Sequence, residues 1–261
     1  MRSKQTNSTS DRKGRMASLL RLSHELGRDG HRMAILAEGN TSVKLSAGTF
    51  LVKASGSNLG TLDKNGVVEC RASVLLSLLG KNNLTDGEIE YALLESRVDA
   101  RAKKPSVEAL FHAYLLSLPG IEFVGHTHAT AVNSILCSPR AKEFATKRIF
   151  PDEIVCCDVA SVFIPYTDPG LRLAQAMREQ TEKFLKDFGR PPRVILMENH
   201  GLITLGRSVE AVLSAMLMAE KTAAIWLGAA VLGGPKFMSP ENVARISGRS
   251  DEALRRKILK L

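Results

Sequence analysis

The chain has 261 residues, of which 44% are hydrophobic and 24% are charged. This composition excludes low-complexity disorder, and four cysteines are too few for a disulfide scaffold, so we expect one globular domain in a reducing, cytoplasmic setting. The formal net charge is +9, but residues 1–16 carry five basic residues against one acidic, and residues 245–261 carry six against two. The region between them therefore nets only +1, which argues against a nucleic-acid partner.

The N-terminal segment is polar and basic, and we expect residues 1–14 to form a flexible tail. Residues 1–16 lack the apolar core of a secretory signal. The longest unbroken apolar stretch spans residues 223–234, which is shorter than the roughly 18 to 20 residues needed to cross a bilayer. The sequence therefore predicts no membrane helix and no membrane partner.

Apolar residues at helical or alternating spacing mark the elements of the first half of the chain. In order, these are a helix at 15–26, a hairpin formed by 41–45 and 49–53 around a Ser-Ala-Gly turn, a strand at 67–70, a helix at 71–79, and a helix at 105–118 with Pro105 in its first turn.

The second half continues with a mixture of strands and helices. We expect a strand at 121–125 leading into residues 126–128, extended runs at 154–159 and 161–165, a helix from 168 to 188, strands at 193–197 and 202–205, and helices from 208 to about 232 and from 239 to about 246. The mixed order predicts an α/β fold with a mixed sheet covered by helices on both faces.

Two of the six histidines stand two residues apart, in His126-Thr127-His128 at the end of a predicted strand. Because side chains alternate along a strand, both imidazoles are expected on the same face. Such a pair can bind one metal ion through its ring nitrogens, although most pairs of this kind are exposed or satisfied by neighbours.

Two further residues strengthen the metal prediction. His200 lies in a Glu-Asn-His-Gly turn after another apolar strand, and Glu108 lies near the start of the predicted helix at 105–118. Three imidazoles and one carboxylate suit zinc, with manganese or cobalt as alternatives. We therefore expect a divalent metal site with a position open to substrate oxygen atoms.

Polar loops near the first hairpin and the N-terminus of the 105–118 helix indicate an anion site. Their backbone N–H groups, their hydroxyls and the helix N-terminus favour a phosphate or another anion. Each loop by itself is more typical of an ordinary turn or helix cap. The residues concerned are Asn40, Thr41, Ser55, Gly56, Ser57 and Ser106.

Together these segments resemble the class II aldolase/adducin family, which includes the fuculose- and rhamnulose-phosphate aldolases. The matching segments occur in the family's order and are Gly39-Asn40-Thr41-Ser42, Ser55-Gly56-Ser57, Pro105-Ser106-Val107-Glu108, Gly125-His126-Thr127-His128 and Asn199-His200-Gly201. We expect a single domain of this kind at 15–246, followed by a basic C-terminal helix or tail at 247–261.

The resemblance implies a three-layer α/β/α sandwich around a mixed, largely antiparallel sheet, and a homotetramer with sites between subunits. It implies that the metal is bound by His126, His128 and His200, with Glu108 as a ligand in the resting site and as the acid/base in turnover. It also implies that the substrate phosphate is held by Asn40, Ser55, Gly56 and Ser106.

The implied activity is aldol cleavage of a ketose, expected to be a ketose 1-phosphate, through a metal-stabilised enediolate to dihydroxyacetone phosphate and an aldehyde. Two positions depart from the fuculose type. Val107 stands where that type has a second serine, and Phe150 stands where it has an acid tyrosine. Asp152 and Glu153 follow and could replace the tyrosine, but surface charge is the simpler assignment.

Other functions fit the same motifs. Relatives with this scaffold catalyse epimerisation, dehydration or decarboxylation of sugar or sugar-acid phosphates, and fold analogy does not choose among them. An adducin-like interaction protein is the non-enzyme alternative, and the retention of all the histidines and of Glu108 argues against it. His112 lies four residues after Glu108, on the same helix face, and is expected to be a structural partner rather than a fourth imidazole ligand.

Overall fold

A seven-stranded sheet forms the centre of the computed structural model, which describes residues 2–46, 48–258 and 260, with side chains from Asp11 onward. The strand order is β3-β2-β1-β4-β7-β6-β5. Neighbouring strands are antiparallel except β5 and β6, which confirms the expected mixed, largely antiparallel sheet. The strands are β1 (Asn40–Lys44), β2 (Thr49–Lys53), β3 (Val67–Arg71), β4 (Phe123–Thr127), β5 (Val162–Ile164), β6 (Val194–Met197) and β7 (Gly201–Gly206).

Helices precede, separate and follow the strands. The longer ones are α1 (Arg2–Leu26), α3 (Asp86–Glu95), α4 (Ala109–Ser117), α8 (Leu171–Phe188), α9 (Val209–Val231), α10 (Pro240–Ser247) and α11 (Ser250–Ile258). The shorter ones are α2 (Ala72–Leu76), α5 (Thr130–Leu136), α6 (Ala141–Thr146) and α7 (Pro151–Cys157). Single 3₁₀ turns lie at Asp29–His31 and Lys64–Gly66.

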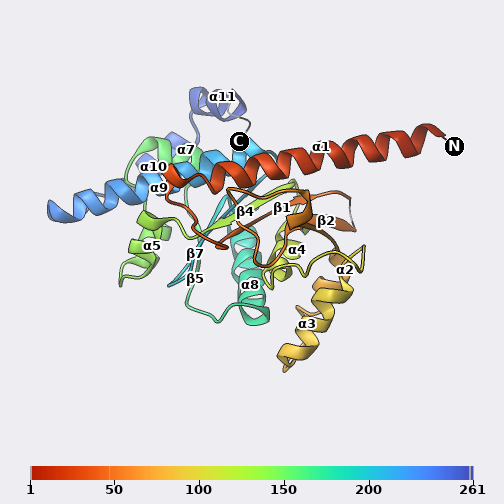
Figure 1. Ribbon diagram of the computed structural model, residues 1–261. Coiled ribbons are helices and arrows are strands. Elements are labelled where there is room, and N and C mark those ends of the chain that lie inside the picture. Colours follow the sequence, from red (N-terminus) through yellow and green to blue (C-terminus); the bar gives the residue numbers. More distant parts are fainter. Residues whose placement is uncertain (1, 47, 259, 261) are drawn as a thin grey trace.

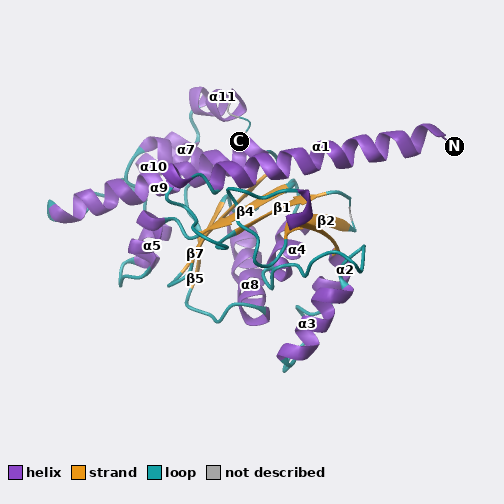
Figure 2. Cartoon of the chain, in the orientation of Figure 1, coloured by secondary structure: helices purple, strands orange, loops and turns teal. Residues whose placement is uncertain are grey.

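Alternating side chains of the sheet enter two separate apolar cores. Val52 and Ile203 belong to the core shared with α4 and α8, whereas Leu51 and Leu202 belong to the core shared with α1 and α9. In Figure 1, α1 and α9 run along one side of the sheet and α8 lies on the other, and Figure 2 shows the strands between these helices. The three-layer α/β/α sandwich is therefore confirmed.

The sheet brings distant motifs to one edge. β4 and β6 are both antiparallel to β7, and β5 is parallel to β6, so the carboxyl ends of these three strands lie at the same edge. β1 begins there, because Asn40 pairs with His126 in the antiparallel register of β1 and β4. The turn between β6 and β7 contains His200. β2 is antiparallel to β1 and ends at the same edge, just before Ser55-Gly56-Ser57, so four of the five sequence motifs meet there.

The helix at 105–118 is confirmed in part, because α4 begins only at Ala109. Pro105 lies outside the first turn and instead forms an isolated β-bridge with Ala54. The backbone N–H of Ser55 also donates to the carbonyl of Lys104, at 3.0 Å. These bonds tie the segment before α4 to the end of β2, so that two of the predicted anion loops meet.

The expected extended run at 154–159 is wrong, because α7 spans Pro151–Cys157. Pro151 occupies the first turn, where its missing N–H costs nothing, and the acidic Asp152 and Glu153 also lie in that turn, where they complement the helix dipole. A short apolar run cannot be assigned to helix or strand by periodicity alone, and here the flanking residues decide for the helix.

Other boundaries also differ from the sequence expectation. α3, α5 and α6 were not predicted, although the capping box that Thr85 and Glu88 form at the start of α3 is visible in the sequence. α1 begins at Arg2, within the segment expected to be a tail, and α8 begins at Leu171. The hairpin residue Ala47 and the terminal positions 1, 259 and 261 lie outside the described residues. The domain limits remain predictions.

Among the described residues, one helix, α9, is long and apolar enough to cross a membrane by length and composition alone. The sequence analysis considered only unbroken apolar stretches and therefore did not identify α9 as such a helix, because Glu220 and Lys221 interrupt its apolar sequence. In its most apolar window 44% of the residues are buried, and the helix packs against α5, α7 and β7. A core helix of a folded domain passes the same test, so this finding is a weak indication of a membrane.

Gly27 follows α1 at a point where two backbones touch. A Cβ at this position would lie 2.1 Å from the backbone nitrogen of Gly60. Because backbone atoms cannot move aside as a side-chain end can, we expect Gly27→Ala to lower the free energy of unfolding by about 1–3 kcal/mol. Gly30→Ala is the matched control, since a Cβ there meets nothing within 4 Å. Equal stability of the two variants in denaturant titrations would contradict the close contact.

Candidate metal centre

His126, His128 and His200 converge at the edge of the sheet. One ring nitrogen from each lies within 4.8 Å of the other two, and the Nε2 atoms of His126 and His128 are 3.2 Å apart. The side chain of His126 is fully buried, whereas 27% of His128 and 12% of His200 are exposed. The structure thus brings together the three histidines that the sequence singles out; their binding of a metal remains a prediction.

The surroundings of His126 prepare it as a ligand. Its Nδ1 lies 2.9 Å from the carbonyl oxygen of Leu202, which can only accept a hydrogen bond, so the ring proton is on Nδ1 and the Nε2 lone pair faces the cluster. Burial lowers the pKa of His126 to about 4, and burial also lowers the pKa of His128. Both rings are therefore neutral near pH 7, as metal ligands must be.

The outer nitrogens of the other two rings have different environments. His128 Nδ1 lies 3.6 Å from Glu38 Oε1, and a carboxylate in this position commonly orients a metal-ligating imidazole. Glu38 is itself held by the backbone N–H of Ile35, at 3.0 Å. His200 Nδ1 is buried without a hydrogen-bond partner among the described residues. Sequence analysis did not identify Glu38, because nothing in its local pattern indicates that it faces His128.

Glu108 reaches the cluster from the N-cap of α4. Its Oε1 lies 3.2 Å from His200 Nε2, and its Oε2 lies 3.6 Å from His126 Nε2. Burial favours a raised pKa for this carboxyl, but the two imidazoles and the amide of Asn40 outweigh burial and hold the pKa well below its ordinary value. The ionised carboxylate and the ring nitrogens of the three imidazoles form a donor set that suits a zinc ion.

Asn40 contacts Glu108 and His112, and its predicted binding of a substrate anion remains a prediction. Its Nδ2 donates to Glu108 Oε2, and its Oδ1 faces His112 Nε2. His112 is completely buried, and burial lowers its pKa to about 3. Its Nδ1 lies 2.6 Å from Ser42 Oγ. His112 is thus a structural partner of Asn40, as expected for this histidine.

One of the predicted anion-binding residues, Thr41, turns away from an anion site. Thr41 is fully buried, and its hydroxyl lies 2.6 Å from Ser23 Oγ in the core beneath α1. The strand alternation explains this orientation, because Thr41 faces opposite to Asn40 and Ser42. The carbonyl of Ser57 accepts a hydrogen bond from Lys53 Nζ at 2.5 Å, so the backbone of Ser57 points inward.

Lys53 is a buried cation that sequence analysis missed. Its ammonium donates to the carbonyls of Ala37 and Ser57, and burial lowers its pKa to about 8 although Glu108 opposes the shift. Lys53 thereby holds the loop after β2, which includes Gly56 in a left-handed conformation with φ of 75°. A lysine at the end of the apolar run Phe50-Leu51-Val52 was the signal that could have revealed it.

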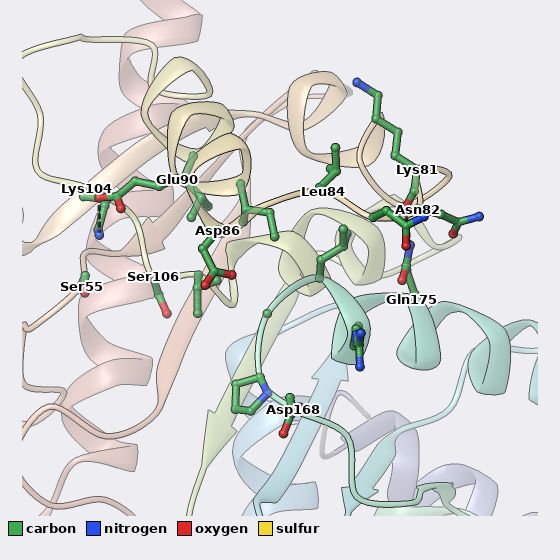
Figure 3. A pocket seen from close by; sticks show the side chains of 18 residues that line it. Ser55, Lys81, Asn82, Leu84, Asp86, Glu90, Lys104, Ser106, Asp168 and Gln175 are labelled. Carbon is green, nitrogen blue, oxygen red and sulfur yellow. Dashed lines mark hydrogen bonds and ion pairs between the residues drawn. The ribbon is translucent and has the colours of Figure 1, made fainter.

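Ser55 and Ser106 line a cavity of about 860 Å³. In Figure 3 the Ser106 hydroxyl and the Asp86 carboxylate point into the same space, and Lys104 pairs with Glu90 at its rim, at 2.9 Å. Val107 is partly exposed and also lines the cavity. The lining combines charges of both signs with amides and apolar side chains, which suits a polar organic ligand.

The positions considered for a proton donor lie elsewhere. Phe150 is the N-cap residue of α7. Glu153 is buried, accepts a hydrogen bond from the backbone N–H of Ile149 and lies 3.5 Å from Arg148. These contacts hold the Glu153 carboxylate beside α7, away from the imidazole cluster.

The comparisons with known proteins agree on one family. Residues 17–227 match the sequence model described as the Class II Aldolase and Adducin N-terminal domain. The "Uncharacterized oxidoreductase YuxG" of Bacillus subtilis is 29% identical over 180 residues, which are 66% of this chain and 24% of that protein. The chain therefore spans about a quarter of the length of this relative.

Two further relatives match most of their own length. The "3-oxo-tetronate 4-phosphate decarboxylase" of Escherichia coli K12 is 27% identical over 71% of this chain and 74% of that protein. The structure of the N-terminal Class II Aldolase domain of a conserved protein from Thermoplasma acidophilum superposes with a TM-score of 0.65, at 28% identity, over 81% of this chain and 93% of that chain.

Removal of one imidazole should release the metal. We expect His200→Ala to lose most of its tightly held zinc, because a ligand is lost and two imidazoles with a carboxylate remain. His31→Ala is the control, since His31 lies outside the cluster and contacts the carbonyl of Glu25. Elemental analysis after zinc loading and dialysis would measure this. A full equivalent of zinc in His200→Ala would show that the ligand set is different.

Proposed function

The chain belongs to the class II aldolase and adducin family, and from that membership we propose that it is a metal-dependent carbon–carbon lyase acting on a phosphorylated ketose or keto sugar acid. The observation that carries the proposal is the convergence of the Glu108 carboxylate with three imidazoles at one edge of the sheet. An adducin-like interaction protein would have no use for a buried carboxylate among imidazoles, so this alternative explains the site less well.

The metal part of the proposal rests on the donor set. His126, His128, His200 and Glu108 would hold a divalent ion, for which three nitrogens and one oxygen favour zinc over manganese or cobalt. A bound ion of this kind supplies a Lewis acid that polarises a carbonyl oxygen of the substrate. The buried Nε2 lone pair of His126, which faces the other rings, supports such an ion.

Glu108 is the proposed proton carrier. In the resting site, its hydrogen bonds with His200 and with the Asn40 amide favour the charged form and make the carboxylate a weak base. A substrate that displaces the carboxylate from these contacts restores its proton affinity, so Glu108 becomes an effective base only after substrate has bound. In the absence of substrate, Glu108 is therefore too weak a base to activate water at this site.

The loops around Ser55, Gly56 and Ser106 are the proposed anion site. They are held together by the bridge between Ala54 and Pro105, and their backbone N–H groups and hydroxyls suit a phosphate. Val107 offers no hydroxyl here, which weakens this site relative to one with a second serine by about 1–3 kcal/mol if that bond is made to a charged group.

Aldol cleavage to dihydroxyacetone phosphate and an aldehyde is one candidate reaction, and decarboxylation of a 3-keto sugar acid phosphate is the second. Two observations favour the second. The hydroxyls of Tyr114 and Tyr166 contact Arg178 and Asp168 rather than the cluster. Carbon dioxide leaves the keto acid carboxylate without a proton donor, and the enediolate that remains needs one proton, which Glu108 can take from solvent and deliver. The 27% identity to a 3-oxo-tetronate 4-phosphate decarboxylase supports the same choice.

We also propose that the protein forms a homotetramer and is cytoplasmic. Apolar side chains lie exposed at the end of α9, where Val231 is 86% and Leu232 is 88% exposed, and contact with further copies would bury them. The four cysteines, of which only Cys137 is exposed, form no disulfide in the described part of the chain, which fits a reducing compartment.

Loss of the carboxylate should separate catalysis from metal binding. Glu108→Gln keeps the size and hydrogen bonds of the side chain but cannot accept a proton, so we expect turnover to fall by about 10²-fold to 10⁴-fold while most of the metal is retained by the three imidazoles. Glu210→Gln, which alters a surface ion pair with Arg21, should remain fully active. Near-normal turnover in Glu108→Gln would identify another group as the base.

A substrate panel would test the anion site and the reaction together. Ketose phosphates, free ketoses and keto sugar acids with and without phosphate would be scored for aldehyde, epimer and carbon dioxide. We expect a phosphate ester to react fastest, inorganic phosphate to compete with it, Ser106→Ala to raise its KM, and Val107→Ser to leave the KM unchanged or lower it. Faster turnover of unphosphorylated compounds, without inhibition by phosphate, would refute the anion site.

A further inference from the structure

Two buried polar atoms without a hydrogen-bond partner belong to the turn between β6 and β7 and to the side chain that holds it. They are His200 Nδ1 and Asn133 Oδ1. The other side-chain atoms of this kind among the described residues are Thr181 Oγ1 in α8 and Glu252 Oε2 in α11, outside this turn. Buried polar atoms of folded proteins usually have partners, so two orphans at one turn call for an explanation.

Asn133 lies on α5, the helix that holds the His200 turn in place. Its Nδ2 donates to the carbonyl oxygen of His200 at 2.9 Å, and the backbone N–H of Asn199 donates to the carbonyl of Leu136, at 3.2 Å. The helix itself is fixed by Glu220 of α9, whose carboxylate accepts two backbone N–H groups in the first turn of α5. The Asn133 amide is therefore anchored against the turn.

The direction of the Asn133 amide follows from its contact with His200. A backbone carbonyl can only accept a hydrogen bond, so the NH₂ end of the amide faces it and the amide oxygen is left over. This oxygen is bonded to the same carbon as Nδ2 and lies at the same turn. It is an acceptor that no donor among the described residues reaches.

Metal binding changes what His200 presents on its outer side. Its Nε2 lies 3.2 Å from Glu108 Oε1, and a carboxylate can only accept, so without a metal ion the ring hydrogen is on Nε2 and Nδ1 carries a lone pair. A neutral imidazole that binds a metal ion through Nε2 carries its hydrogen on Nδ1 instead. That hydrogen is buried and needs an acceptor.

We propose that Asn133 Oδ1 accepts the Nδ1 hydrogen of His200 when this ring binds the metal ion, so that Asn133 is a positioning residue for the third imidazole. Both orphaned atoms then gain a partner. An acceptor at the outer nitrogen fixes a metal-bound ring and strengthens its binding, and Glu38 lies in the corresponding place beside His128. The proposal rests on the metal-binding part of the proposed function and is independent of the reaction catalysed.

Zinc affinity separates the two ends of the amide. Asn133→Leu removes both ends, and we expect it to weaken zinc binding by about 10-fold to 100-fold. Asn133→Asp loses the donor to the His200 carbonyl but keeps an acceptor, so we expect it to recover most of the zinc affinity while it lowers stability as much as Asn133→Leu does. Competition with a chromophoric chelator would give the Kd, and denaturant titration of the zinc-free proteins would give the stability.

A charge control completes this comparison. Ser134→Asp adds the same charge at the next residue of α5, which is exposed, and we expect the Kd for zinc to stay close to that of the wild type. Three results would overturn the proposal: an unchanged Kd in Asn133→Leu, an equal loss of affinity in Asn133→Asp, or a gain from Ser134→Asp as large as the recovery in Asn133→Asp.

A second measurement uses the wild-type chain and needs no substrate. In protein labelled with ¹⁵N-histidine, two-bond NMR correlations report which ring nitrogen carries the hydrogen. We expect His200 to carry it on Nε2 without zinc and on Nδ1 with zinc, where it should exchange slowly with solvent. Rapid exchange of this hydrogen in the zinc-loaded protein would overturn the proposal.

The same samples distinguish this proposal from the proposed function. A wild-type chain that binds no zinc would refute the metal centre and the role of Asn133 together. Tight zinc binding with an unchanged Kd in Asn133→Leu would refute only the role of Asn133. The expected Kd values and the expected tautomer, with no activity on any substrate, would instead refute only the proposed lyase reaction.

Discussion

The site depends on one buried carboxylate that is held in its charged form. Glu108 lies between the imidazoles of His126 and His200 on one side and the amide of Asn40 on the other. A buried carboxylate without such partners would take up a proton. The surrounding contacts therefore decide both its charge and its direction, and they couple the carboxylate to the residues that would bind a metal.

The sheet provides the framework that brings these groups together. Antiparallel pairing of β1 with β4 places Asn40 opposite His126, and the β6–β7 turn brings His200 to the same edge. The turn also requires Gly201, because a Cβ there would lie 2.5 Å from the Thr127 carbonyl oxygen and 2.9 Å from the His128 ring. Close backbone packing thus allows three imidazoles from two strand ends to converge.

Much of this arrangement could be read from the sequence because it depends on local patterns. Alternation along a strand places His126 and His128 on one face. The order of five short motifs indicated the family and the sandwich fold, and it also indicated that His200 and Glu108 lie close to these two histidines. Turn and cap signals also located most strands and α9, whose N-cap Ser208 bonds to the N–H of Ala211. These features depend on residues close in sequence or on motifs with a strict spacing.

Only the tertiary structure decided which partner each polar group would find. Asn40 and Thr41 are neighbours in a polar loop motif, yet one holds Glu108 and the other bonds Ser23 in the opposite core. Lys53 and Glu38 acquire their contacts from segments that meet only after folding, and residues 154–157 are helical within the packed core. Hydrogen-bond partners across a sheet depend on register and layer, and a linear pattern contains neither.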